Sequence, residues 1–271
     1  MSTSIHAVAQ QGYGAGTNDL YDRARPSYQS NAVSHIRQAV KTAGAVNVVE
    51  IGAGTGIFTR ALLAHPEWKD SLGKLKAVEP SAGMRATFAR TVVDPRVSVA
   101  EGSFAATGVE DGWADVIIIA QAFHWCPDYE AAAKEFARVL KPNGVVALVW
   151  NLDDRDAAAW VAQLRDFVEG HMSFPIGLWR TFFGLPSYGA SFKPEKEETW
   201  EYTLPGTLEI VTERALSSSS IAILGEEEKK GVCEEIKKIM RRGDGLVWRD
   251  EGKGEFEYPY KTNVVICEKQ A

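Results

Sequence analysis

The first half of the chain alternates short apolar runs with segments whose apolar residues recur at helical spacing. Five runs rich in β-branched residues predict buried strands at 46–51, 75–78, 97–100, 115–120 and 145–150. Three segments with helical spacing lie between them, at 58–64, 82–91 and 129–140. Strands that alternate with helices predict an α/β fold with an open, doubly wound, mostly parallel sheet.

After residue 151 the pattern changes. Residues 172–195 are rich in Phe, Trp, Gly and Pro and have no clean period, which favours an insertion or lid over a second domain. We expect the lid to cover a ligand and to determine specificity. The remaining predicted elements are helices at 157–169, 208–216 and 226–241 and strands at 198–204 and 260–267. The last two strands are expected to pair antiparallel at one edge of the sheet.

Composition and charge narrow the class of protein. The 271 residues carry a net charge of −6, which disfavours a nucleic-acid partner. Cys126, Cys233 and Cys267 are too scattered for a disulfide framework or a zinc site, so no metal is expected. Because no apolar signal core or membrane-length run is present, we expect no membrane partner and a cytoplasmic location.

The stretch VVEIGAGTGIF places Gly52, Gly54 and Gly56 directly after the first predicted strand. The dinucleotide fingerprint would require its third glycine at Ile57, so a nicotinamide-dependent oxidoreductase is disfavoured. A phosphate-binding loop would require a Gly-Lys-Ser/Thr sequence, which is absent. The acidic Glu50, two residues before the first glycine, suits a cationic ligand better than a pyrophosphate.

Five motifs in order resemble those of the class I, seven-stranded methyltransferases that depend on S-adenosylmethionine (SAM). They are VVEIGAGTGIFTR, AVEPSAGM, AEGSF, ADVIIIAQAFHW and VLKPNGVVALV. The N-terminal YDRARPSY is similar to small-molecule methyltransferases of the quinone-biosynthesis and trans-aconitate groups. The resemblance implies a seven-stranded sheet with an antiparallel C-terminal edge strand and an aromatic-rich lid.

The resemblance also implies how one domain, 1–271, is divided. The parts are cap helices at 1–45, a SAM-binding core at 46–151, a lid and edge strand at 152–206, and C-terminal helices with the last strand at 207–271.

The resemblance further implies a set of cofactor-binding residues. Glu79 is expected to accept hydrogen bonds from the ribose hydroxyls, and Met84 and Phe104 to enclose the adenine. Arg25 is a candidate for the SAM carboxylate, with a surface salt bridge as the alternative. The complete set is Tyr21, Arg25, Glu50, Gly52, Ala53, Gly54, Glu79, Pro80, Met84, Gly102, Ser103, Phe104 and Gln121.

Candidates for the acceptor side follow the fourth and fifth strands. His124 is the candidate catalytic residue, either as a general base or as a group that positions the acceptor; a buried structural imidazole is the alternative. Trp125, Trp150 and Trp179 are candidates for acceptor binding, although some of these rings could belong to the core. The acids at 153, 154 and 156 are expected to form a solvated loop.

The expected activity is methyl transfer from SAM to an oxygen of a small organic acceptor, a phenol or a carboxylate, by in-line displacement, with S-adenosylhomocysteine as product. Transfer to sulfur or nitrogen, and a SAM-binding biosynthetic enzyme or module that does not methylate, remain alternatives. An aromatic acceptor is one possibility, and the expected oligomeric state is a monomer or weak homodimer.

Overall fold

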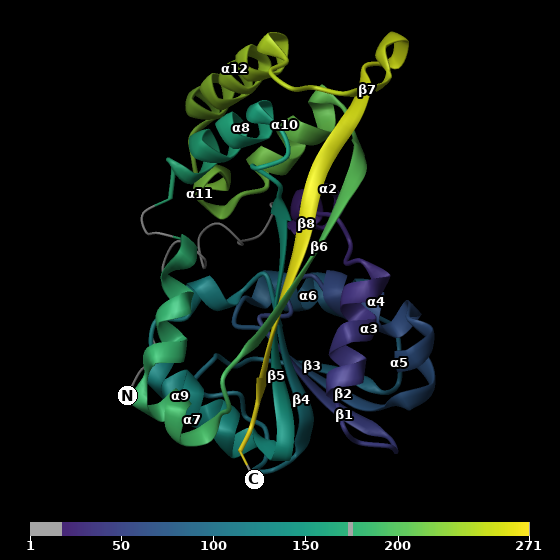
Figure 1. Ribbon diagram of the computed structural model, residues 1–271, viewed down its shortest axis with the longest axis vertical. Helices are drawn as coiled ribbons and strands as arrows, with labels where there is room; N and C mark the ends of the chain where they lie inside the picture. Colours follow the sequence, from purple (N-terminus) through teal and green to yellow (C-terminus); the bar gives the residue numbers. More distant parts are fainter. Residues whose placement is uncertain (1–17, 173–175, 271) are drawn as a thin grey trace.

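One open sheet runs through the protein (Figure 1). The computed structural model describes residues 18–172 and 176–270. The strands are β1 (Val46–Ile51), β2 (Leu72–Val78), β3 (Val97–Ala100), β4 (Ala114–Ala120), β5 (Leu140–Asp153), β6 (Lys196–Gly206), β7 (Trp248–Asp250) and β8 (Glu255–Glu268). Their order is β3-β2-β1-β4-β5-β8-β6, and β7 pairs with β8.

The predicted α/β fold with a mostly parallel sheet is confirmed. Strands β1 to β5 pair in parallel, whereas β8 is antiparallel to both β5 and β6. The antiparallel strand was expected at the edge; it lies one place inside, and β6 is the edge strand. Residues 260–266 of β8 pair with β5 along one edge and with β6 along the other. The short β7 makes the sheet eight-stranded.

Helices cover both faces of the sheet and gather beyond one end of it. The α-helices are α2 (Asn18–Ala24), α3 (Ser30–Ala39), α4 (Ile57–Ala64), α5 (Pro66–Ser71), α6 (Ala82–Thr91), α7 (Tyr129–Val139), α8 (Ala159–Glu169), α9 (Pro186–Ser191), α10 (Leu208–Leu216), α11 (Ser219–Ala222) and α12 (Glu226–Arg242). Three 3₁₀ helices are η1 (Phe123–Trp125), η2 (Ile176–Gly184) and η3 (Glu251–Lys253).

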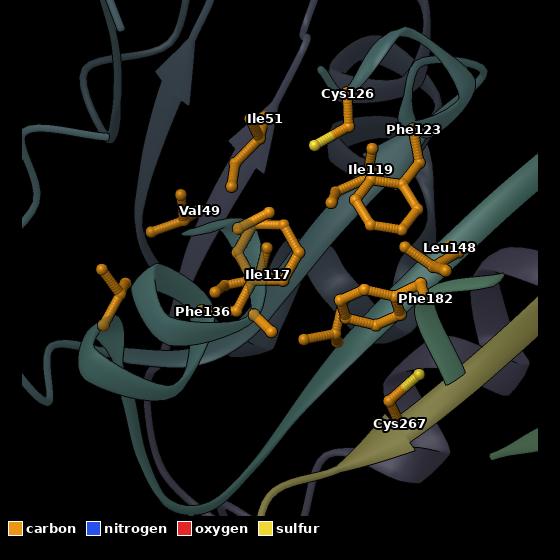
Figure 2. Packing of buried hydrophobic residues seen from close by; sticks show 14 of the residues in the cluster. Val49, Ile51, Ile117, Ile119, Phe123, Cys126, Phe136, Leu148, Phe182 and Cys267 are labelled. Carbon is orange, nitrogen blue, oxygen red and sulfur yellow. The ribbon is translucent and has the colours of Figure 1, made fainter. Parts of the chain in front are cut away.

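The sheet separates two apolar cores because successive strand residues point to opposite faces. On β4, Ile117 and Ile119 enter the core that contains α7, η2 and α9, as Figure 2 shows. Val116 and Ile118 enter the other core, which contains α3 and α4. Both faces of β4 are therefore buried under apolar side chains, as expected for a central strand of a parallel sheet.

The aromatic segment expected to form a lid belongs to the first of these cores. Phe182 is fully buried, and its ring lies edge-on to that of Phe123 at 4.9 Å. Tyr188 and Phe192 are also buried and stack on each other. The large rings of residues 176–192 therefore bury their area against the sheet face and α7, and the role of the segment in covering a ligand stays a prediction.

A third core lies beyond the end of β5. It contains Trp160 of α8, Val211 of α10, Ile236 of α12 and Tyr258 of β8. Strands β6 and β8 continue past β5, whose last pair with β8 is Asp153 with Tyr260. We call α8, α10, α11, α12, β7 and the adjoining ends of β6 and β8 the helical lobe; it stands above the carboxyl ends of the parallel strands (Figure 1).

Candidate active site

The turn from β1 to α4 requires glycine for two reasons. Gly52, Gly54 and Gly56 all have left-handed backbone, with φ of 70°, 56° and 87°. A Cβ on Gly52 would lie 2.5 Å from the Cβ of Ala122, so the chain there also needs the missing side chain. A Cβ on Gly54 would meet nothing nearer than the Met84 sulfur at 3.9 Å, so the space over Gly54 is open.

Glu79 lies at the end of β2 and faces this turn. Its two carboxylate oxygens accept hydrogen bonds from the backbone N–H groups of Gly54 (2.9 Å) and Ser81 (2.8 Å). Burial raises the pKa of Glu79, and these two bonds oppose that rise. Each oxygen keeps a further lone pair, so a pair of ribose hydroxyls can still donate to this carboxylate. Pro80 contributes its carbonyl oxygen to Arg85, which holds the turn in place.

The turn after β3 carries the residues expected beside the adenine. The Ser103 hydroxyl oxygen is buried and has no hydrogen-bond partner in the described part of the chain. Phe104 packs edge-on to Phe123, and its ring reaches the space beside Gly52. A Cβ on Gly102 would lie 2.6 Å from the Val78 side chain, so this turn sits tightly against β2. A buried hydroxyl that needs a partner fits an adenine amino group, although it is a weaker acceptor than a carboxylate would be.

A small cavity of about 30 Å³ lies over the glycine turn; we call it the glycine-loop pocket. Glu50 borders it and accepts a hydrogen bond from the Thr59 hydroxyl at 2.5 Å. Burial, with a smaller contribution from Glu79, raises the pKa of Glu50 to about 8. An ammonium group placed here would stabilise the ionised form. The residues expected to bind SAM that line this pocket are Tyr21, Arg25, Glu50, Gly52, Ala53, Gly54 and Gln121.

Arg25 is held by a residue of the helical lobe. Its Nε donates to the Ser217 hydroxyl at 2.9 Å and its Nη2 to the Ser217 carbonyl oxygen at 3.1 Å. Its guanidinium carbon lies 5.1 Å from the centre of the Tyr21 ring. Further guanidinium N–H groups remain for a carboxylate, so the exposed surface salt bridge considered from sequence is wrong for Arg25.

A larger cavity of about 110 Å³ adjoins the glycine-loop pocket; because it lies between the sheet and the helical lobe, we call it the junction pocket. Tyr21, Arg25, Gln121, Asn151 and Arg214 line both cavities. The two cavities therefore adjoin each other, and a ligand in one is adjacent to a ligand in the other.

His124 lines the junction pocket from η1, just after β4. Burial, and to a lesser extent the charge of Arg25, lowers the pKa of His124 to about 3. The ring is therefore neutral at physiological pH and can donate or accept a hydrogen bond, but it is a weak base. Its neighbour Gln121 has left-handed backbone (φ 57°), and its side-chain amide donates to the Asn151 carbonyl oxygen at 2.5 Å.

The three candidate tryptophans lie in two different environments. Trp125 lines the junction pocket. Trp150 and Trp179 line neither cavity; their rings stack at 4.0 Å in the core on the α7 face. Alternation along β5 points Trp150 to the same face as Leu148 and leaves Asn151 at the junction pocket, so acceptor binding by Trp150 and Trp179 stays a prediction.

Sequence reasoning missed the charged residues of the junction pocket. Asp153 lies 3.6 Å from the Arg214 guanidinium, and Asp154 lies 3.1 Å from Lys261. The expectation of a solvated loop is therefore wrong for both acids, which are largely buried, although Asp156 is exposed. The position of Asp153 just after the apolar run of β5 was a usable signal, because ligands bind at the carboxyl ends of parallel strands.

The described residues suit both ends of SAM, the nucleoside and the amino-acid part. The open space over Gly54, the Glu79 carboxylate and the Ser103 hydroxyl suit the nucleoside, while Glu50 and Arg25 suit the ammonium and carboxylate. Residues 18–172 and 176–270 contain no cluster of three His, Cys, Asp or Glu side chains able to hold a metal ion. Over the same residues, no helix has the length and apolarity that would span a membrane.

Comparison with known proteins gives concordant results. Residues 49–148 match the profile of a family described as a methyltransferase domain. An uncharacterized methyltransferase-like protein of Schizosaccharomyces pombe is 30% identical over 255 residues, which span 92% of this chain and 93% of the relative.

Two solved structures share the fold. A protein of Anaeromyxobacter dehalogenans, assigned as a type II methyltransferase, aligns with a TM-score of 0.63 and 19% identity over 91% of this chain and 97% of that one. The cyclase SpnF aligns with a TM-score of 0.54 and 14% identity over 92% of this chain and 85% of that one.

Proposed function

Because the chain belongs to the class I SAM-dependent methyltransferases, we propose that it transfers the methyl group of SAM to an oxygen atom of a small organic acceptor in the junction pocket. The observation that carries the proposal is that the two cavities adjoin each other and share five lining residues. This arrangement places an acceptor in the junction pocket next to a methyl group presented from the glycine-loop pocket.

The chemistry of the transfer is simple. The acceptor oxygen forms a bond to the methyl carbon as the carbon–sulfur bond breaks; the electron pair goes to sulfur and S-adenosylhomocysteine is the second product. A carboxylate acceptor has no proton to lose, whereas a phenol releases one. Because most of the rate enhancement can come from holding the two reactants in line, the protein's main task is positioning.

Several residues of the junction pocket can position the acceptor. Neutral His124 can form a hydrogen bond to an acceptor oxygen, and Gln121, fixed by Asn151, holds the turn beside it. Three arginines line the junction pocket, which disfavours a protonated amine and favours an anionic oxygen. This charge supports an oxygen acceptor over a nitrogen one.

The proposal is tested with SAM labelled in the methyl group and a panel of phenols, carboxylic acids, thiols and amines. We expect the label in phenol ethers or carboxylate esters, and expect none with Glu79→Ala at a SAM concentration limiting for that variant. Label in thioethers or methylamines alone would contradict the oxygen assignment. Acceptor chemistry without loss of label from SAM would indicate a SAM-binding enzyme that does not methylate.

A further inference from the structure

Three arginines and two acids line the junction pocket, namely Arg25, Arg165, Arg214, Asp153 and Glu169. Burial would raise the pKa of Asp153, but the nearby arginines lower it below its usual range, so this acid is ionised. With Arg25 assigned to the SAM carboxylate, two arginines and two acids remain and their formal charges balance. The hydrogen-bonding state of the arginines, and not the net charge, therefore identifies the ligand.

Arg214 is the least satisfied of the three arginines. It lies on α10 between Val211 and Ala215, both buried in the third core, and is itself only 6% exposed. Its Nε is 3.6 Å from Asp153, which is too long for a hydrogen bond. Its Nη1 is buried and has no hydrogen-bond partner among residues 18–172 and 176–270.

A second arginine of the junction pocket also has a buried guanidinium N–H group without a hydrogen-bond partner among the described residues. Arg165 of α8 pairs with Glu169 through Nη2, but its Nε is buried without a hydrogen-bond partner in the described part of the chain. The Oδ1 of Asp153, 3.6 Å from the Arg214 Nε, also lacks a hydrogen-bond partner in the described part of the chain. A buried donor without a partner is costly, so two such donors on residues that line one cavity favour a ligand that accepts hydrogen bonds. The ligand best matched to arginine N–H groups in a small pocket is a carboxylate.

We propose that Arg214, with Arg165, binds a carboxylate group of the acceptor, so that the enzyme acts on small organic acids. The inference rests on the proposed function in taking the junction pocket as the acceptor site. The pocket, at about 110 Å³, is small beside the roughly 300–1,000 Å³ typical of ligand sites, which favours small acceptors. Arg25 is left for the SAM carboxylate.

The first experiment measures binding without turnover. Small acids of three to nine carbons, among them succinate and 4-hydroxybenzoate, are titrated into the protein saturated with S-adenosylhomocysteine, each beside its neutral amide. We expect at least one acid to bind about 10- to 100-fold more tightly than its amide. If no acid in the panel binds more tightly than its amide, the proposal is overturned.

The second experiment assigns the preference to a side chain. Arg214→Gln should remove the acid preference and Arg214→Lys should retain part of it. Because Arg214 also borders the glycine-loop pocket, S-adenosylhomocysteine affinity can fall in Arg214→Gln, but by less than the affinity for the acid. Arg180→Gln is the matched control, because Arg180 is half exposed, pairs with Glu197 and lies outside the junction pocket. If Arg214→Gln weakens S-adenosylhomocysteine binding as much as acid binding, Arg214 belongs to the cofactor and the proposal is overturned.

Two further comparisons separate a folding defect from a loss of acid binding, and a failure of this proposal from a failure of the proposed function. If Arg214→Gln does not fold, Arg214→Lys and Arg165→Gln, compared on the same acid and amide pairs, decide the question: unchanged acid preference in both overturns the proposal. Binding is read independently of catalysis, so an enzyme that binds acids but methylates no oxygen would defeat the proposed function and leave this inference standing.

Discussion

The glycine-loop pocket and the junction pocket are adjacent, but they are built in different ways. The first is formed mainly by the end of β1 with the turn that follows it and by residues 21–28, and Glu79 at the end of β2 holds that turn, so its key groups are backbone atoms and strand-end acids. The second takes much of its wall from α8, α10 and β8, which are far apart in the chain. A sequence motif can therefore identify the residues of the glycine-loop pocket, which is the cofactor half of the site. The residues of the junction pocket, the acceptor half, depend on how the helical lobe packs.

This difference implies that the two halves can be perturbed separately. Changes in the turns should alter SAM binding, changes at the lobe should alter acceptor binding, and changes in the sheet core should alter stability alone. Variants in the sheet core, in the turns and at the junction pocket should therefore have different effects.

The largest effect is expected in the sheet core. Phe182→Ala removes a fully buried ring that packs on Phe123 and should lower the free energy of unfolding by about 3–5 kcal/mol, measured by urea denaturation. Affinities for S-adenosylhomocysteine and acceptor should change little. Leu178→Ala, in the same segment but 48% exposed, is the control and should cost about 0.5 kcal/mol or less. A shift in acceptor KM with unchanged stability would instead support a role of this segment as a lid.

A large effect on the cofactor half is expected from Glu79→Ala. Loss of the carboxylate removes charge-assisted hydrogen bonds, so S-adenosylhomocysteine affinity should fall by about 1.5–3 kcal/mol, measured by calorimetry. Glu110→Ala is the control, because its side chain is 66% exposed and pairs with Lys76. An unchanged affinity in Glu79→Ala would mean that the ribose is held elsewhere.

A pH dependence should mark the ammonium end of the cofactor half. Since the pKa of Glu50 is raised to about 8, the carboxyl is mostly protonated at pH 6 and must lose its proton to pair with an ammonium. Affinity for S-adenosylhomocysteine should therefore rise by about one to two orders of magnitude from pH 6 to 8 and level off about one unit above the pKa. Glu50→Gln should lack this dependence, as should 5′-methylthioadenosine, which has no ammonium. Equal pH profiles for both ligands would remove Glu50 from the site.

The smallest effect is expected at His124. With a pKa lowered to about 3 by burial and Arg25, the ring stays neutral above pH 5, so the rate should be flat there as far as this group is concerned. His124→Ala should reduce the rate about two- to tenfold, equally for acceptors of different pKa, and His124→Gln should recover much of it. A loss of about 10²- to 10⁴-fold that shrinks for more acidic acceptors would instead identify a general base.

Local signals in the sequence predicted much of the fold. The helices at 82–91 and 208–216 match α6 and α10 residue for residue, because each has both an apolar face and clear flanking signals. The same helical spacing puts Arg214 on the buried face beside Val211 and Ala215, which could have drawn attention to it.

Other features required the tertiary structure. The lobe that meets Arg25 through Ser217 cannot be inferred from either segment alone, because the contact joins opposite ends of the chain. Neither could the separation of Trp125 from Trp179 be predicted, since both lie in aromatic-rich segments and only packing decides which ring is enclosed in the core.

The placement of β8 between β5 and β6 has a consequence for how the chain is assembled. Strand β6 is made before β8, yet β8 is its only described neighbour in the sheet. During synthesis, β6 must therefore wait unpaired, and β5 keeps an open edge until β8 inserts between them. Open strand edges invite pairing with other chains, so this interval is when a nascent chain is most exposed to aggregation. The turns after β1 and β2 are complete well before that insertion, so the nucleoside half can form early and the acceptor half is finished late.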